Sequence, residues 1–364
     1  MNRAHNFFAG PAILPVEVLE KARDAAMDFN NLGVSILEIS HRSKDFEKVI
    51  QEAQADCLEI AGLSAADYAV IFVGGGASQQ FLTVPTNFLN KKAEYINTGV
   101  WATKAYKEAV WVAKQRNLTV KETATSKDAN FNYLPRGWKV DDDSDYVHIT
   151  TNNTIYGTEL KETPDVSIPL IADMSSNMFS RQYDFSKYSL IYAGAQKNIG
   201  PAGVVMAIIK KDWLEKCAYP DVPTMLNYKT HVKEESLFNT PPVFPIYVVG
   251  QTLKWILNKG GLGKIEEMNA EKAGYIYGAI DTMNDFYKGS VLNPIDRSFM
   301  NITFNLRKPE LEDQFIKEAK ALNMLGLKGH RSVGGVRASV YNACPMESAK
   351  ALSKFMEEFY KANK

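Results

Sequence analysis

Residues 190–203 read Leu-Ile-Tyr-Ala-Gly-Ala-Gln-Lys-Asn-Ile-Gly-Pro-Ala-Gly, an apolar strand that runs into a turn rich in glycine and proline. A second apolar strand follows at 204–209, so Lys197 lies at a junction between two predicted strands. Rigid backbone holds a lysine at such a junction and removes part of its solvent, and burial lowers the pKa of an ammonium group. The neutral amine that results can attack a carbonyl. A solvated lysine in a surface turn is the competing interpretation.

An aspartate upstream weakens that competing interpretation. Asp173 follows an apolar strand expected at 167–172, and a carboxylate at the carboxyl edge of a parallel sheet lies where ligands bind. A lysine for the aldehyde of pyridoxal phosphate and an aspartate for its pyridine nitrogen are the protein groups that this cofactor most needs. The carboxylate would keep that nitrogen protonated, which makes the ring an electron sink. Asp173 could instead serve as an N-cap for residues 174–176.

The composition is that of an ordinary globular chain and sets limits on its partners. The 364 residues are 45% hydrophobic and 23% charged, and 42 basic residues balance 42 acidic ones. No overall field favours nucleic acid or an anionic membrane, so anion binding has to come from local clusters. Three widely spaced cysteines indicate a reduced, cytoplasmic chain without disulfides or structural zinc. Five histidines in no ligand spacing argue against a metal site, and no signal peptide or membrane helix is expected.

Helical and strand patterns alternate along the first 260 residues. Amphipathic helices are expected at 15–29 and 44–61, where apolar residues recur at helical spacing. Strands are expected at 68–73, 94–97, 145–150, 167–172, 189–193 and 204–209. Strands separated by helical or loop segments predict an α/β fold with a mostly parallel sheet.

The pattern changes after residue 261. The expected elements there are a helix at 262–287, a strand at 299–306, a helix at 309–323, a strand at 336–341 and a closing helix from 345. We therefore expect a large domain at 15–260 and a smaller α+β domain at 261–364, with segment 1–14 packed against the smaller one.

A glycine turn, Gly-Gly-Gly-Ala-Ser at 74–78, follows one strand and opens a helix. Small residues let backbone N–H groups approach a phosphate, and the dipole of the helix favours the anion. Gln79 replaces the third glycine of a dinucleotide fingerprint, and the Gly-Lys-Ser/Thr of a nucleotide P-loop is missing. The turn therefore suits a phosphate monoester, although many such turns bind nothing.

Two further residues follow predicted strands. Trp101 could stack on a pyridine ring or fill the core. Thr154, in Asn-Asn-Thr at 152–154, could hydrogen-bond the phenolic oxygen of the cofactor, and turn chemistry alone also explains these residues.

Two His-Arg pairs and one more arginine form a local supply of positive charge. His41 and Arg42 follow a strand-like segment at 35–39, whereas His330, Arg331 and Arg337 lie in and after a glycine-rich stretch. Arginine forks bind carboxylate and phosphate oxygens in pairs. Each residue could instead be solvated or form an internal ion pair. The glycines around the second cluster indicate a tight loop, which favours anion binding.

Taken together, these segments resemble the phosphoserine aminotransferases, class-V members of the fold-type I enzymes that use pyridoxal phosphate. The matching stretches run in order along the whole chain, at 6–12, 38–43, 74–78, 172–176, 190–203, 239–242 and 328–339. The strings Ala-Gly-Ala-Gln-Lys-Asn and Gly-His-Arg-Ser-Val-Gly-Gly are highly specific, whereas the glycine turn alone is not. The resemblance implies a large domain with helices on both faces of its sheet, and pyridoxal 5'-phosphate as the cofactor.

The resemblance also implies roles for particular residues around the cofactor. Lys197 would carry the Schiff base, and Asp173 would pair with the pyridine nitrogen. Trp101 would stack on the ring, and Thr154 would contact its 3-oxygen. The residues expected at the cofactor phosphate are Gly76, Ala77 and Gln196, with Asn239 and Thr240 reaching it from the neighbouring subunit of a homodimer with shared active sites.

By the same resemblance, the substrates are glutamate and a phosphorylated 2-oxo acid. Arg337 would bind the α-carboxylate, and the distal anion would be held by His41, Arg42, His330 and Arg331. The implied reaction converts 3-phosphohydroxypyruvate and L-glutamate to O-phospho-L-serine and 2-oxoglutarate in serine biosynthesis, with a side activity in pyridoxine biosynthesis left open. Two positions depart from the family: Ala77, where some members have arginine, and Asn153, where many have glutamate.

Other functions remain in competition. The same fold supports alanine–glyoxylate transamination, which would have little use for two His-Arg pairs, and cysteine desulfuration, for which no cysteine lies in an evident catalytic loop. A non-catalytic protein that stores pyridoxal phosphate is the rival from another class. It would have no need of Asp173 as a partner for an electron sink.

Overall fold

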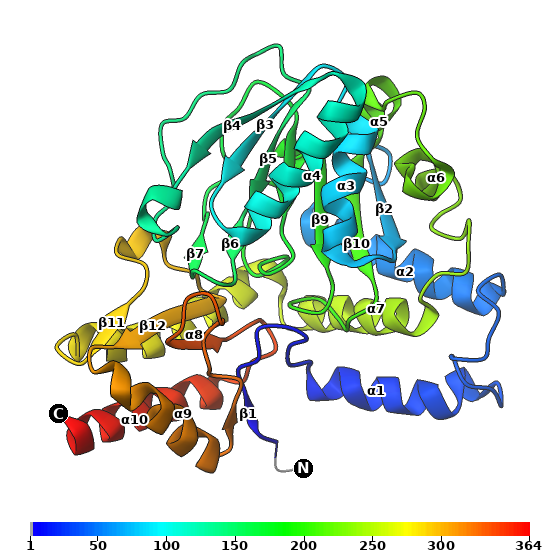
Figure 1. Ribbon diagram of the computed structural model, residues 1–364. Coiled ribbons are helices and arrows are strands. Elements are labelled where there is room, and N and C mark those ends of the chain that lie inside the picture. The colour runs from blue at the N-terminus through cyan, green and yellow to red at the C-terminus, as the bar shows by residue number, and fades with distance from the viewer. Residues whose placement is uncertain (1–2) are drawn as a thin grey trace.

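The computed structural model describes residues 3–364, so the first two residues of the expected segment 1–14 lie outside the described residues. A seven-stranded sheet forms the centre of the larger part of the molecule (Figure 1). In spatial order its strands are β2 (Tyr68–Val73), β10 (Val205–Lys210), β9 (Leu190–Gly194), β8 (Leu170–Asp173), β5 (Tyr146–Thr150), β3 (Lys92–Asn97) and β4 (Thr119–Thr125). Strand β10 is antiparallel to both of its neighbours, and all other pairings are parallel. The expected α/β fold with a mostly parallel sheet is confirmed.

Alternation of side chains along the strands gives the sheet two buried faces. In β2, Val70 and Phe72 belong to one hydrophobic cluster and Ile71 to another. Successive side chains of a strand point to opposite faces, so both faces need a cover. Helices α2 (Lys44–Ala61) and α7 (Val243–Asn258) cover one face, and α3 (Gly76–Phe88), α4 (Val100–Arg116), α5 (Lys211–Cys217) and α6 (Tyr228–Lys233) supply the other cluster (Figure 1).

Helix α2 occupies the residues that the sequence predicted. Ser43 caps it by accepting a hydrogen bond of 3.3 Å from the backbone N–H of Phe46, and Gly62 ends it in the left-handed conformation. Helix α1 (Val16–Met27) stops two residues before the predicted end at 29 because Asp28 adopts an extended conformation with φ −152°.

The smaller part of the molecule is built around a three-stranded antiparallel sheet. Its elements are β11 (Tyr287–Gly289), β12 (Asn301–Leu306), β14 (Val336–Ser339), α8 (Gly261–Thr282), α9 (Glu312–Ala321) and α10 (Met346–Asn363). The N-terminal strand β1 (His5–Asn6) pairs in parallel with β13 (Met324–Leu325), and Phe7 and Ile13 are buried in the same cluster as α8 and α10 (Figure 1).

Several expectations about secondary structure are wrong. Residues 35–39 form a turn and not a strand, because the backbone N–H of Ser35 donates to Glu38 Oε2 (2.9 Å) and its hydroxyl accepts from Leu37 N (3.0 Å). The helix expected at 262–287 ends at Thr282, and Tyr287 begins β11. Two elements were not predicted: β4, which is a largely polar edge strand, and α7, whose apolar residues lack a clear periodicity.

Candidate active site

A cavity of about 330 Å³ opens where the parallel strands end. Loops after β2, β3, β5, β8 and β9 reach it, because the carboxyl ends of parallel strands meet at one edge of a sheet. All seven residues expected at the cofactor from this chain line it, together with two of the arginine–histidine set: Gly76, Ala77, Trp101, Thr154, Asp173, Gln196, Lys197, His330 and Arg337.

Lys197 lies on the wall of this cavity. Its Nζ donates a hydrogen bond of 2.8 Å to Thr154 Oγ1 and lies 5.4 Å from the centre of the Trp101 ring. Burial lowers the pKa of Lys197 to about 8; Asp173 opposes this shift and Arg337 adds to it. A larger fraction of this amine is therefore neutral near physiological pH than of an ordinary lysine, as a nucleophile requires.

The N-terminal segment packs across the stem of this lysine. Gly10 adopts φ +143°, and a Cβ at this position would lie 3.2 Å from Lys197 Cγ. The backbone N–H of Ala12 donates to the carbonyl of Gln196 at 2.8 Å. Glycine is needed at position 10 for both reasons, since its φ is strained for other residues and the approach is close. From the sequence, this segment was expected to pack against the smaller domain and was assigned no contact with Lys197.

Asp173 ends β8 and lies inside the cavity with one oxygen free. Its Oδ1 accepts hydrogen bonds from the backbone N–H (2.9 Å) and the hydroxyl (2.6 Å) of Ser175, whose Oγ also accepts from Gly194 N at 3.0 Å. No hydrogen bond from residues 3–364 reaches Oδ2. Burial raises the pKa of Asp173, and Ser175 and Lys197 oppose the shift. A cationic N–H donor would satisfy Oδ2. The contact of Oδ1 with the N–H of Ser175 is the kind of capping bond that the sequence left open for Asp173 and residues 174–176.

Trp101 lies in the first turn of α4, with its ring beside Lys197. Its Nε1 is buried and has no partner among the described residues. The turn is set by a close approach at Gly99, where a Cβ would lie 2.4 Å from Asn153 Oδ1. Asn153 in turn donates from Nδ2 to Thr98 Oγ1 and to Thr158 Oγ1, each at 3.0 Å. The unusual Asn153 therefore packs under the start of α4 and helps to place the ring of Trp101.

Two sets of donors that suit an anion line the cavity together with the lysine. In the first set, the N-terminus of α3 brings Gly76, Ala77 and Ser78 to the cavity, where free N–H groups and the helix dipole favour a phosphate. In the second set, the guanidinium of Arg337 donates to the carbonyl of Thr154 at 3.1 Å and keeps its buried Nε unpaired. Ser78 is a lining residue that the sequence analysis did not single out.

His330 lines the cavity with Arg337 in the second set. Its Nδ1 is 2.7 Å from Ser332 Oγ in the turn that follows. Burial, Arg337 and Arg331 lower the pKa of His330. A bound anion would offset this cationic environment, which fits the predicted distal anion site.

Five predicted site residues do not line the cavity of this chain: His41, Arg42, Asn239, Thr240 and Arg331. Arg42, Arg331, Asn239 and Thr240 are exposed, whereas His41 is half-buried with an unpaired Nε2. The cavity of a single chain thus contains the lysine and the residues predicted to contact the cofactor ring, but only part of the predicted distal anion site.

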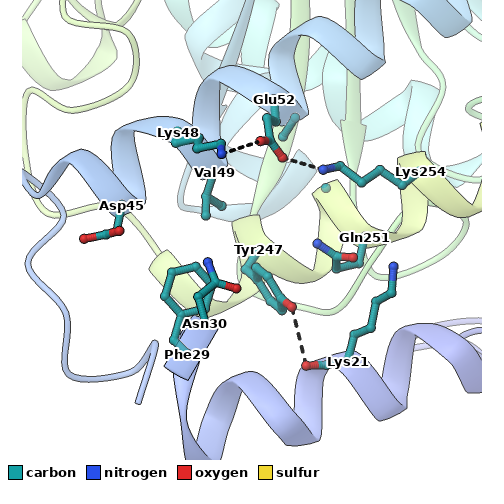
Figure 2. A pocket seen from close by; sticks show the side chains of 12 residues that line it. Lys21, Phe29, Asn30, Asp45, Lys48, Val49, Glu52, Tyr247, Gln251 and Lys254 are labelled. Carbon is teal, nitrogen blue, oxygen red and sulfur yellow. Dashed lines mark hydrogen bonds and ion pairs between the residues drawn. The ribbon is translucent and has the colours of Figure 1, made fainter. Parts of the chain in front are cut away.

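A second cavity, of about 430 Å³, lies between α1, α2 and α7 (Figure 2). Glu52 pairs there with Lys254 and, at 3.9 Å, with Lys48, and Tyr247 donates its hydroxyl to the carbonyl of Lys21 at 3.5 Å. No residue predicted for the site lines this cavity, and two of its lysines already have a carboxylate partner.

The first cavity fits pyridoxal phosphate on four counts. Lys197 supplies an amine of lowered pKa for the aldehyde, and the free Oδ2 of Asp173 supplies an acceptor for the pyridine nitrogen. Trp101 offers a flat ring, and the start of α3 offers donors for one phosphate monoester. The residues that are present therefore match the cofactor group by group.

Comparison with known proteins agrees with this geometry. Residues 4–352 match the family of class-V aminotransferases. The chain is 52% identical to a phosphoserine aminotransferase of Phocaeicola vulgatus over 361 residues, 99% of both chains. The chain belongs to the phosphoserine aminotransferase family. It is a class-V aminotransferase that depends on pyridoxal phosphate, as expected from the sequence.

Solved structures of the family have the same fold. The phosphoserine aminotransferase of Bacillus circulans subsp. alkalophilus superposes with a TM-score of 0.95 at 46% identity, covering 100% of both chains. A phosphoserine aminotransferase of Trichomonas vaginalis, described as bound to pyridoxal phosphate, gives a TM-score of 0.92 at 39% identity and covers 98% of this chain and all of that one. The fold-type I architecture expected from the sequence is confirmed.

Two features, a metal-binding group of side chains and a membrane-spanning helix, are absent from residues 3–364. No three His, Cys, Asp or Glu side chains gather there in a group that could hold a metal ion. None of the helices in this range combines the length and the apolar character that crossing a membrane requires.

Proposed function

We propose that this aminotransferase converts 3-phosphohydroxypyruvate and L-glutamate to O-phospho-L-serine and 2-oxoglutarate. The observation that carries the proposal is the position of Lys197. Its amine, whose pKa is lowered to about 8, lines one cavity with the carboxylate of Asp173 and the guanidinium of Arg337, and both are near enough to shift that pKa. A group for the electron sink and a group for a carboxylate thus share one cavity with the base.

Each residue of the chain has a distinct task in this proposal. Bound pyridoxal phosphate supplies an aldehyde that holds the substrate amine and a ring that accepts electrons from Cα. Arg337 orients the α-carboxylate, and Asp173 keeps a proton on the ring nitrogen. The amine of Lys197 would be the base that takes the proton from the substrate Cα and holds it for its return. Thr154 accepts a hydrogen bond from Nζ, which fixes the position of the amine in the cavity.

The distal anion site accounts for the choice of substrates. It has to hold either the γ-carboxylate of glutamate or a phosphate that carries nearly two charges. His330 and Arg331 would supply donors from this chain, and His41 and Arg42 would supply them from a second copy. Several donors, two of them titratable, adapt to both anions better than one arginine fork. They also compensate for Ala77, where some family members have an arginine.

A homodimer with shared active sites follows from the same residues. Asn239, Thr240 and Arg42 are exposed and do not line the cavity of their own chain. Large apolar side chains beside them are exposed, with 64% of Leu37 and 43% of Phe238 accessible. Such a surface indicates a partner, and a second copy would bring Arg42 and Asn239 to the incomplete site.

Co-expression of two impaired variants, assayed well below KM, tests the shared site. In a mixed dimer of Lys197→Ala and Arg42→Ala subunits, one site would lack both residues and the other would be complete. Random pairing should therefore restore about a quarter of wild-type activity per dimer. Sites confined to one chain would give no restoration, which would contradict the proposed dimer.

A panel of acceptors with glutamate as donor tests the function itself. We expect 3-phosphohydroxypyruvate to exceed pyruvate and glyoxylate in kcat/KM by about a hundredfold or more, since unpaired cations remain when the phosphate is missing. Equal rates with glyoxylate would contradict the proposal. A phosphorylated precursor of pyridoxine belongs in the same panel, because it presents the same anion.

Two expectations about organisation are also part of the proposal. We place the domain boundary at 260/261, with segment 1–14 belonging to the smaller domain, because the buried Phe7 and Ile13 pack with α8 and α10. We place the enzyme in the cytoplasm, since all three cysteines are free thiols. Limited proteolysis and cell fractionation test these two points.

A further inference from the structure

Three residues of the proposed site are followed by loops that meet in one buried cluster of hydrogen bonds. The loops come after Asp173, Lys197 and Arg337, at the ends of β8, β9 and β14. We infer that Asn342, at the centre of the cluster, is a positioning residue that sets these three side chains against one another. The inference rests on the proposed transamination and names a residue outside the cavity.

All four polar groups of Asn342 are paired. Its backbone N–H donates to Asn198 Oδ1 at 2.9 Å, and its Nδ2 donates to the carbonyl of Phe179 at 2.9 Å. Its Oδ1 accepts from Asn269 Nδ2 at 2.8 Å, and its carbonyl accepts from Lys272 Nζ at 3.2 Å. Only 2% of Asn342 is exposed, so these four hydrogen bonds fix both its side chain and its backbone.

Asn198 connects this centre to the reactive lysine. It is the next residue after Lys197, and its Nδ2 donates to the carbonyl of Met178 at 2.7 Å while its Oδ1 holds Asn342. The loop after β9 is thereby tied to the loops after β8 and β14 through one side chain. The loop after β8 is itself constrained at Phe179. This residue has φ +56°, which is unfavourable for a bulky side chain unless its surroundings enforce it.

Helix α8 holds the loop from the other side. Asn269 and Lys272 lie three residues apart on this helix and therefore share a face. Nζ of the fully buried Lys272 donates to the carbonyls of Tyr341 (2.6 Å) and Asn342 (3.2 Å), and Asn269 Nδ2 also donates to the carbonyl of Ser180 at 2.8 Å. The donors of α8 are thus directed at the backbone that continues from the strand of Arg337.

This linkage has a consequence for the reaction. Arg337 fixes the substrate through its carboxylate, whereas Lys197 acts on the neighbouring Cα, so the two side chains need a defined separation. The bond between Asn342 and Asn198 joins their loops directly. A displacement of about 1 Å far from the reacting atoms can lower a rate by about a hundredfold, so loss of this cluster should slow proton transfer more than it weakens binding.

The test compares Asn342→Ala with a buried asparagine elsewhere. Asn87 is fully buried and makes three similar hydrogen bonds, to the carbonyls of Thr83 (2.8 Å) and Leu226 (2.7 Å) and from the backbone N–H of Tyr228 (3.2 Å). It does not line the cavity. Asn87→Ala therefore controls for the general loss of stability that any buried asparagine causes.

The measurement is the single-turnover rate of the loaded enzyme with saturating glutamate, together with the dissociation constant of glutamate. We expect Asn342→Ala and Asn198→Ala to lower the rate about tenfold or more and to change the dissociation constant about threefold or less. Asn87→Ala should keep the wild-type rate. Wild-type rates in both cluster variants, or an equal loss in Asn87→Ala, would overturn the inference.

A second readout does not depend on activity. In the apoprotein, Asn198→Ala removes the acceptor of the Asn342 amide, so hydrogen exchange of that amide should accelerate while exchange at Tyr228 stays unchanged. Unchanged exchange at Asn342 would overturn the inference even if Asn342→Ala did not fold. A wild-type enzyme that fails to transaminate glutamate would instead refute the proposed function, which separates the two failures.

Discussion

The side-chain amine of Lys197 donates a hydrogen bond of 2.8 Å to the hydroxyl of Thr154. The two residues come from loops after β9 and β5, which are separated in the sheet by β8 with its terminal Asp173. This contact places the reactive nitrogen across the end of β8. The carbonyl of Thr154 also accepts from Arg337, so one threonine orients both the base and the carboxylate-binding arginine.

Replacement of Thr154 tests this double role. Thr154→Val keeps the shape and the backbone carbonyl but removes the hydroxyl acceptor, so we expect cofactor affinity to fall about tenfold, the effect of one lost hydrogen bond. Thr154→Ser restores the acceptor and should regain most of the affinity. Equilibrium titration of the apoproteins with pyridoxal phosphate measures both, and equal affinities in the two variants would contradict the role.

The lowered pKa of Lys197 predicts how cofactor loading depends on pH. Only the neutral amine attacks the aldehyde, so the rate of cofactor incorporation into the apoprotein should rise with pH and level off above a midpoint near 8. Stopped-flow absorbance over pH 6 to 10 measures this rate, and a midpoint near 10.5 would contradict the desolvated environment.

The lowered pKa of Lys197 also makes the stability of the folded protein depend on pH in a predictable direction. The unfolded lysine has a pKa of 10.5 and the folded one a pKa of about 8, so the unfolded state binds more protons between these values. The contribution of Lys197 to the free energy of unfolding of the apoprotein should therefore rise with pH from about 8 upward. Lys197→Met should flatten this rise in chemical denaturation below pH 10; an unaltered slope would argue against the shift.

Asp173 is expected to matter for the rate and little for the fold. Asp173→Asn retains the volume but cannot keep the ring nitrogen protonated, so kcat should fall about a hundredfold or more. Ser175→Ala, which removes one of the hydrogen bonds that orient the carboxylate, should have a smaller effect in the same direction. Steady-state assays with glutamate decide the order, and a fully active Asp173→Asn would refute the assignment.

Arg42 tests whether two substrates use one distal anion site. Arg42→Ala should raise KM for 3-phosphohydroxypyruvate and for glutamate together, each by about tenfold or more, because charged hydrogen bonds to the same anion position are lost. The matched surface control is Arg23→Ala, an exposed arginine that pairs only with Asp24. An effect on only one substrate would show that the anions bind separately.

Much of the site could be predicted because it lies where strands end. Asp173 and Lys197 follow apolar runs, and the carboxyl edge of a parallel sheet brings such residues together whatever the loops do in detail. Both ends of helix 44–61 were predicted correctly from the spacing of its apolar residues, and Ser43 and Gly62 cap the helix at these ends. The turn at 35–39 was mistaken for a strand, since a hydrogen bond that the Ser35 hydroxyl accepts from the backbone N–H of Leu37 decides it.

Other parts of the site have no local signal. The hydrogen bond between Asn198 and Asn342 joins residues 144 positions apart, and each looks like an ordinary loop asparagine in the sequence. Gly10 is required by the stem of Lys197, which packs on it only in the folded chain. The positions of His41, Arg42, Asn239 and Thr240 relative to a cavity depend on a second copy and stay predictions.

The central claim is that Lys197 is the amine that binds the cofactor. Reduction of the loaded enzyme with borohydride, followed by peptide mapping, tests it directly, with Lys197→Ala and Lys272→Ala as matched variants of the two lysines whose pKa desolvation lowers to about 8. We expect one pyridoxyl label, on Lys197, that is lost in Lys197→Ala and kept in Lys272→Ala. A label on any other lysine, or none, would contradict the account.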